Sequence, residues 1–161
     1  MVSRNQSIFL SRVIPVIIIV VWVFLTFLPV IKGEFLNWDD HSHVVDNSTV
    51  RNFDVARMFS EPVQKIYIPL TTLTFAIEHK FFANRPIGYH FDNLILHVLN
   101  AILVYFFALR LGVGTTGAWL SSILFGVHPM RVESVAWITE RKDLLYAFFY
   151  LLAMLTYLKY L

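Results

Sequence analysis

Two adjacent carboxylates, Asp39 and Asp40, follow Trp38 a few residues beyond the first long apolar stretch of the chain, Val13–Ile31. That position would set them at the boundary between lipid and water, where a membrane-embedded enzyme meets lipid-borne and aqueous reactants. A carboxylate placed there can act as a general base that removes the proton of a hydroxyl group. Because neighbouring side chains rarely point the same way, we expect one carboxylate to face a reactant and the other to hold the loop or a cation.

A second polar segment, between the third and fourth apolar stretches, carries basic groups that suit an anion. Arg141 and Lys142 are the candidates for binding a phosphate, and Arg131 is a weaker one. For Arg141 and Lys142, the alternative to phosphate binding is ordinary anchoring at the membrane interface. Two further residues of the segment, His128 and Glu133, could orient one of the reactants.

The spacing within this second segment predicts a short helix. Glu133, Trp137 and Arg141 lie four residues apart. A helix here would therefore present an acid, an indole and a guanidinium on one side.

The loop that begins with the acid pair offers other interpretations as well. Asp39 and Asp40 could form only a solvated loop start or a helix cap. His41, His43 and Asp46 could join them in a metal site, because alternate residues of an extended strand share a side. The spacing fixes no complete ligand set, so the metal is unknown and a divalent cation is left open as a cofactor.

The composition identifies a membrane protein: 57% of the 161 residues are hydrophobic and only 15% are charged. The net charge of +2 and the scattered basic residues argue against nucleic acid as a partner. We expect an all-α, polytopic protein, with residues 1–161 forming a single membrane domain. The predicted spans are 12–31, 91–110, 114–128 and 144–160, and the predicted outer loops are 32–90 and 129–143.

Charge around the first span predicts its orientation. Arg4, Arg12 and the amino terminus outweigh the basic charge on the far side, so the N-terminus should stay cytoplasmic and the acid pair should lie outside. Arg131, Arg141 and Lys142 then lie outside as well, against the usual tendency. We interpret this conflict as a sign that these groups serve a purpose such as holding a lipid phosphate.

The first outer loop is long enough to need structure of its own. Pro69 followed by Leu70, Leu73, Ile77 and Phe81 gives an apolar stripe at helical spacing, which predicts a helix lying along the membrane surface. A second, weaker amphipathic helix is predicted over residues 50–59.

Two faces of the spans predict helix packing. His90, Asn93, His97 and Asn100 line one side of the second span, where interhelical hydrogen bonding is favoured over contact with substrate. On the third span, small residues recur every four positions and let another helix approach closely. They are Gly114, Ala118, Ser122 and Gly126.

Four ordered stretches carry a resemblance to a known family. They are Trp38-Asp39-Asp40, Ile68–Ala76, Gly88–His97 and the run from His128 to Leu145. Together they resemble the N-terminal membrane region of the transmembrane and tetratricopeptide-repeat O-mannosyltransferases and their bacterial relatives, from about Phe35 to the end of the chain.

The resemblance implies part of a GT-C fold, a helical membrane glycosyltransferase that takes a sugar from a polyprenyl-phosphate carrier of dolichyl or undecaprenyl type on the outer or lumenal face. Family members transfer mannose to Ser or Thr hydroxyls, so the implied partners are a mannosyl or other hexosyl donor in the bilayer and a protein acceptor. Asp39, after an aromatic residue, matches the position of the family's base. Family members also continue through further spans into helical repeats, so a fragment of a longer chain is expected.

The residues of the last motif, from His128 to Leu145, resemble the bacterial branch of the family more closely. This favours a bacterial inner membrane over the endoplasmic reticulum. Two other functions are considered as alternatives to the transferase. A non-catalytic membrane scaffold would explain the small-residue face and the short chain. A cation or metal transporter would explain the polar seam and His41-Ser42-His43, but four spans without an internal repeat argue against it.

Overall fold

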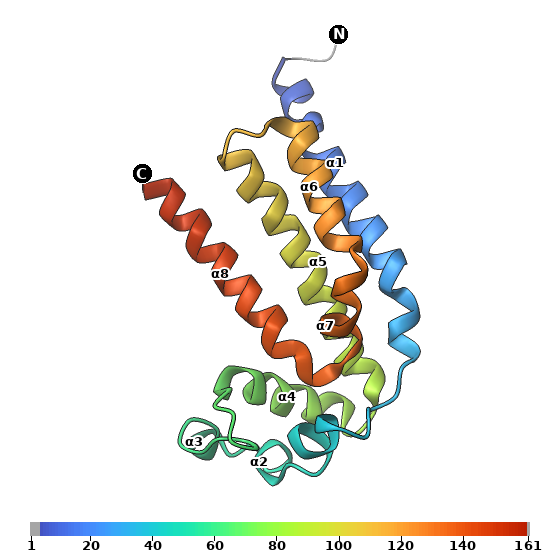
Figure 1. Ribbon diagram of the computed structural model, residues 1–161, viewed down its shortest axis with the longest axis vertical. Coiled ribbons are helices and arrows are strands. Elements are labelled where there is room, and N and C mark those ends of the chain that lie inside the picture. The colour runs from blue at the N-terminus through green and yellow to red at the C-terminus, as the bar shows by residue number, and fades with distance from the viewer. Residues whose placement is uncertain (1–3, 161) are drawn as a thin grey trace.

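The computed structural model describes residues 4–160, with side chains from residue 13 onward, and shows an all-helical chain, as predicted. Four long helices run along one another, and a group of short helices closes one end of them (Figure 1). The long helices are α1 (Arg4–Phe27), α5 (Pro86–Arg110), α6 (Gly114–Val127) and α8 (Arg141–Tyr160).

The short helices after η1 (Leu28–Lys32), which lies at the end of the predicted first span, belong to the two segments that the sequence assigns to outer loops. The first segment contains the π-helical turn η2 (His41–Val45), α2 (Ser48–Arg51), α3 (Val55–Met58) and α4 (Pro69–Phe82). The second contains η3 (Pro129–Arg131), α7 (Val132–Ala136) and η4 (Ile138–Glu140). Both segments lie at one end of the bundle, whereas the turn between α5 and α6 and the C-terminal end of α8 lie at the other (Figure 1).

Prolines set where three of these helices begin. Pro69 lies in the first turn of α4, Pro86 in that of α5 and Pro129 in that of η3. Proline is suited to this position because its missing N–H would have no partner there and its backbone angle is already helical. As a result α5 begins five residues before the predicted second span.

The small-residue face of α6 packs as predicted. Ala118, Ser122 and Gly126 are buried, and Ser122 Oγ donates to the Ala101 carbonyl of α5 at 2.6 Å. A methyl group added at Gly126 would lie 2.5 Å from a Val23 methyl of α1. Close approach of α6 to both neighbours therefore depends on the absence of a side chain at Gly126.

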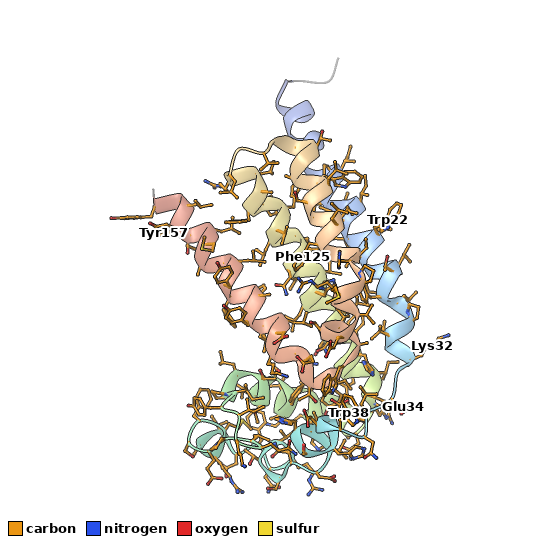
Figure 2. All side chains as sticks on the ribbon, in the orientation of Figure 1. Trp22, Lys32, Glu34, Trp38, Phe125 and Tyr157 are labelled. Carbon is orange, nitrogen blue, oxygen red and sulfur yellow. The ribbon has the colours of Figure 1, made fainter. Side chains whose placement is uncertain are left out.

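Helix α8 packs against α5 near its start and then diverges from the bundle (Figure 1). Arg141 and Leu144 are its buried residues. Its later aromatic side chains are exposed, and Tyr157 projects away from the other helices (Figure 2). Most of α8 is therefore free to contact lipid or other protein.

Two stretches of the described residues, Val13–Lys32 and Pro86–Arg110, are long and apolar enough to cross a bilayer. The 14 residues of α6 rise only about 21 Å, less than the hydrocarbon layer of about 30 Å. The 20 residues of α8 would reach about 30 Å.

The predicted helix that begins at Pro69 is confirmed as α4. The apolar stripe of this helix faces outward: Leu70, Ile77 and Phe81 are exposed, whereas the opposite face with Phe75 and Glu78 is buried against the rest of the chain. An outward apolar stripe is what a helix at a membrane surface needs.

The predicted helix over residues 50–59 is wrong. The chain forms two separate turns, α2 and α3, because Phe53 between them adopts a positive φ of 54°, which ends a right-handed helix. Asn47 and Asp54 cap the two turns by accepting backbone N–H groups.

The packing at Gly126 leads to a first prediction. Gly126→Val should lower the free energy of unfolding by about 1–3 kcal/mol, because its side chain must displace Val23 or Ala101. Ser121→Ala is the matched control, since Ser121 is exposed and its hydroxyl bonds only within α6, to the Gly117 carbonyl. Thermal unfolding in detergent measures both; equal melting temperatures for the two variants would contradict the close packing.

Candidate active site

Asp40 is completely buried, and its carboxylate joins the two outer segments. Oδ2 accepts the backbone N–H of Leu36 at 2.9 Å, within its own loop. Oδ1 accepts the backbone N–H of Thr139 at 3.0 Å and the hydroxyl of the same residue, 99 positions further along the chain. The acid pair and the start of α8 therefore lie together, at the same end of the bundle.

Asp39 has a different environment from its neighbour. It is half-buried, and its carboxylate accepts no hydrogen bond from the described residues, while its backbone carbonyl accepts the Ser42 hydroxyl at 2.9 Å. The pair thus separates as expected, into one carboxylate that holds the loop and one whose oxygens are available to a reactant.

His43 lies beneath the acid pair with 2% of its surface exposed. Burial lowers the pKa of the His43 imidazole, and the Lys142 ammonium acts in the same direction, while the Asp39 and Asp40 carboxylates oppose both. The charges of Asp39, Asp40 and Lys142 therefore all act on the same ring. The sequence alone indicates His43 only as a candidate metal ligand.

Lys142, unlike its neighbour Arg141, remains partly accessible. Its ammonium bonds to Glu140 and lies 5.9 Å from the centre of the Trp137 ring, and 28% of its side chain is exposed. Glu140 uses one of its three N–H donors, so the others can reach a ligand.

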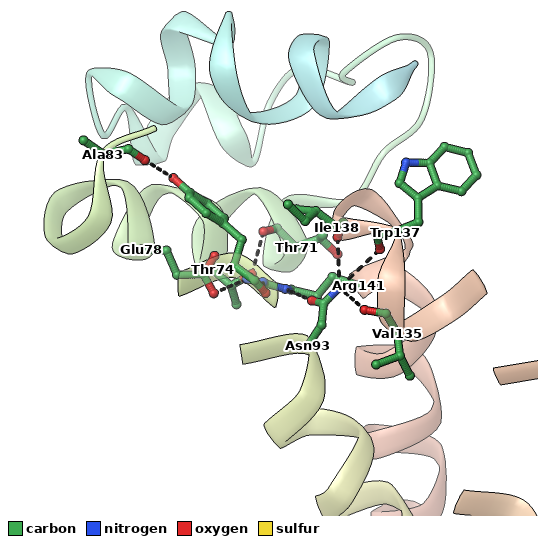
Figure 3. A network of polar contacts seen from close by, with 10 residues as sticks. Thr71, Thr74, Glu78, Ala83, Asn93, Val135, Trp137, Ile138 and Arg141 are labelled. Atoms are coloured by element: carbon green, nitrogen blue, oxygen red, sulfur yellow. Dashed lines mark hydrogen bonds and ion pairs between the residues drawn. The ribbon is translucent and has the colours of Figure 1, made fainter. Parts of the chain in front are cut away.

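Arg141 is fully buried in a network that joins α4, α5 and α8 (Figure 3). Its Nε donates to Asn93 Oδ1 at 2.7 Å and its Nη2 to the Tyr89 carbonyl at 2.8 Å. Its Nη1 donates to Glu78 and, at 3.3 Å, to Thr74 Oγ1. Four of its five donors are used within the chain, which leaves little capacity for a phosphate.

Glu78, the acid of this network, was not singled out from the sequence, although a charge among the apolar residues of a surface helix was a usable signal. Burial raises the pKa of Glu78 to about 9, the Asp92 carboxyl adds to the rise, and the Arg141 guanidinium opposes both. This carboxyl therefore holds a proton more tightly in the folded chain than in water.

The polar seam of α5 is confirmed as a hydrogen-bonding face at three of its four predicted positions, Asn93, His97 and Asn100, but not at His90. Asn93 Nδ2 donates to the Trp137 carbonyl at 3.2 Å, and Asn100 Nδ2 to the Leu144 carbonyl at 2.9 Å. His97 Nε2 bonds to the Gly126 carbonyl at 2.8 Å. The seam thereby fixes where α6 and α8 lie along α5.

The expected single helix through Glu133, Trp137 and Arg141 is wrong. Helix α7 ends at Ala136, and Trp137 has an extended ψ of 117° before the next turn begins. Glu133 is consequently exposed while Arg141 points into the network.

The remaining predicted residues, His128 and Arg131, contact other parts of the second segment and α6. His128 is exposed, and its Nδ1 accepts the Met130 N–H at 3.2 Å, which caps η3. Arg131 is half-buried with its guanidinium 4.7 Å from the centre of the Phe125 ring. Neither residue makes a hydrogen bond or ion pair with the acid pair.

Among the described residues, no three His, Cys, Asp or Glu side chains are grouped to hold a metal. His41 and His43 lie on a π-helical turn instead of the expected strand, and only His43 is buried. His41 pairs with Asp46, with 3.6 Å between Nδ1 and Oδ2. The divalent cation stays a prediction.

Two hollows lie near the candidate site, one lined by Lys142 and the other by Trp38, the residue before Asp39. The first, the α4–α8 groove, has a volume of about 380 Å³ and is lined by Lys142 and apolar side chains that include Leu70, Tyr146 and Phe149. The second, the tryptophan pocket, has a volume of about 450 Å³ and is lined by Glu34, Leu36, Trp38, Val132, Glu133 and Trp137.

Comparison with known proteins supports the family resemblance. The chain is 32% identical to the human protein O-mannosyl-transferase TMTC4 over 152 residues, covering 79% of this chain and 20% of that protein. It is 32% identical to the Caenorhabditis elegans protein O-mannosyl-transferase F38B6.6, covering 83% of this chain and 21% of that protein. Human TMTC3 is 30% identical, over 74% of this chain and 14% of that protein.

The chain thus spans about a fifth, or less, of the length of the curated relatives it matches. These relatives are animal proteins, so they lend no support to a bacterial inner membrane. No family profile matches the chain, and no solved structure does.

The contacts of Asp40 lead to a second prediction. Asp40→Ala should lower the free energy of unfolding by about 3 kcal/mol, because the N–H groups of Leu36 and of the buried Thr139 lose their acceptor. Asp39→Ala should change it by less than about 0.5 kcal/mol, because no hydrogen bond depends on the Asp39 carboxylate. Thermal or denaturant unfolding compares them, and equal losses would contradict the assigned difference.

Glu78 leads to a third prediction, on pH. Because its pKa is raised from 4.5 to about 9, its contribution to stability is complete below about pH 4.5 and is lost as the pH rises toward 9. Melting temperatures across this range should therefore fall more steeply for the wild type than for Glu78→Gln. Glu61→Gln, at an exposed acid, is the control and should follow the wild type; parallel curves for wild type and Glu78→Gln would refute the shift.

Proposed function

We propose, since this chain belongs to the TMTC family of protein O-mannosyl-transferases, that it forms the membrane region in which such an enzyme transfers a sugar to a protein hydroxyl. The observation that carries the proposal is the Asp40 contact to Thr139, because it joins the loop that contains Asp39 to the turn that precedes Lys142. The donor is a polyprenyl-phosphate sugar, with mannose or another hexose as the sugar.

Asp39 is the general base of this reaction. Its carboxylate takes the proton of a Ser or Thr hydroxyl as the hydroxyl oxygen forms a bond to the anomeric carbon. The bond between that carbon and the phosphate oxygen breaks, and the polyprenyl phosphate leaves with the bonding electrons. Asp40 keeps the base in place through its contacts with Leu36 and Thr139.

Lys142 stabilises the departing phosphate. Its ammonium lies at the polar end of the α4–α8 groove, whose other walls are almost entirely apolar. An isoprenoid chain in this groove would place its phosphate beside Lys142 and its sugar toward Asp39. We assign Arg141 to positioning, because its donors hold α4, which forms one wall of this groove, and α5 against the start of α8.

The four long helices cross the membrane in this proposal, with the N-terminus cytoplasmic and both outer segments on the opposite side. The shared location of those segments at one end of the bundle supports this topology (Figure 1). Helix α6 is short for a span, and η3, which His128 caps, extends it toward the outer surface. The basic residues outside then have a purpose, since Lys142 binds an anion and the guanidinium of Arg141 is held by Asn93, Glu78 and the Tyr89 carbonyl.

The test is Asp39→Asn in the full-length protein, with sugar transfer to a protein acceptor measured in membranes. We expect the rate to fall by about 10²–10⁴-fold, the usual contribution of a general base. Asp46→Asn, which changes an exposed acid of the same loop, should retain the rate. Undiminished transfer by Asp39→Asn would remove this residue from the mechanism.

A further inference from the structure

We infer that the tryptophan pocket binds the acceptor polypeptide and selects segments in which an apolar and a basic side chain flank the acceptor hydroxyl. The inference rests on the proposed function and names the acceptor class for the same site. It is argued from the pocket's position, its charge and the exposure of one of its walls.

The pocket is continuous with the proposed site. Trp38 precedes the base Asp39 in the sequence, and its ring meets the Trp137 ring edge to face with centres 5.4 Å apart. Trp137 also lies beside Lys142. One indole therefore forms a wall of the pocket and a neighbour of the group that holds the donor phosphate.

Charge distinguishes the two hollows that flank the site. The α4–α8 groove has Lys142 at its polar end, whereas the tryptophan pocket has the exposed carboxylates of Glu34 and Glu133 at its rim. Glu34 and Trp38 lie near each other at the end of the bundle below α1 (Figure 2). Two carboxylates repel a lipid phosphate and attract a Lys or Arg side chain, so the anionic donor belongs in the groove and the acceptor in the pocket.

The walls of the pocket suit a peptide side chain. Leu36, Val132 and the two indoles form an apolar lining, and about 450 Å³ is within the range of pockets that hold a ligand. Trp38 is 75% exposed although it is the largest apolar side chain of its loop. Exposed tryptophan is typical of residues that become buried when a partner binds.

The experiment measures binding of fluorescent peptides to the full-length protein in nanodiscs, without any sugar donor. The probes are one serine peptide with a leucine and an arginine beside the serine, and the same peptide with glutamate in place of arginine. We expect the arginine peptide to bind about tenfold more tightly, a difference of about 1.4 kcal/mol. The double variant Glu34→Gln/Glu133→Gln should lose most of this preference, and Trp38→Ala should weaken both peptides.

Glu61→Gln is the matched control and should keep the preference, because Glu61 pairs with Arg57 outside the pocket. A wild type without preference, or a double variant that retains it, would overturn the inference. If Trp38→Ala reduces retention of the protein in the membrane but leaves peptide affinity unchanged, Trp38 is a membrane anchor and the inference fails. Because binding is measured without donor, preferred binding without sugar transfer would contradict the proposed function alone.

Discussion

A carboxylate removed from water must find hydrogen-bond donors within the protein, and Asp40 finds them in two segments that are 99 residues apart. This requirement brings the loop after α1 against the turn before α8. Asp39 lies in the same loop, and its own carboxylate makes no hydrogen bond to the described residues. The buried acid therefore determines where Asp39, the proposed base, lies.

A second buried charge sets the other side of the site. Arg141 needs partners for the same reason as Asp40, and it takes them from α4 and α5. The next residue of the same helix, Lys142, points about 100° further round and reaches the surface beside Trp137. Two adjacent basic residues thus differ: Arg141 bonds within the protein, whereas Lys142 is partly exposed and is the proposed phosphate ligand.

Much of the fold could be predicted from the sequence, because helical periodicity and proline positions act locally. Pro69 and Pro86 open the helices that follow them, and the seam that contains Asn93 bonds across helices as its spacing indicated. The breaks at Phe53 and Trp137 could not be predicted, since each depends on a backbone angle that tertiary contacts select. They separated one expected helix into α2 and α3, and another into α7 and the start of α8.

The assignment of roles within the site could be predicted only in part. The sequence indicated that Asp39 and Asp40 would diverge, but it carried no signal for Thr139, whose N–H and hydroxyl decide which acid is buried. It likewise treated Arg141 and Lys142 as equivalent, because the difference between them arises from Glu78 on a distant helix. Long-range partners of buried charges are what the sequence alone does not reveal.

The most direct measurement of the central claim is crosslinking between the two outer segments in the native membrane. The chain contains no cysteine, so pairs introduced at Trp38 and Trp137 have no background, and a short bifunctional thiol reagent should join them in the full-length protein. A pair at Trp38 and Gly112, which lies in the turn at the opposite end of the bundle, should not react. Crosslinking of the second pair but not of the first would contradict the account.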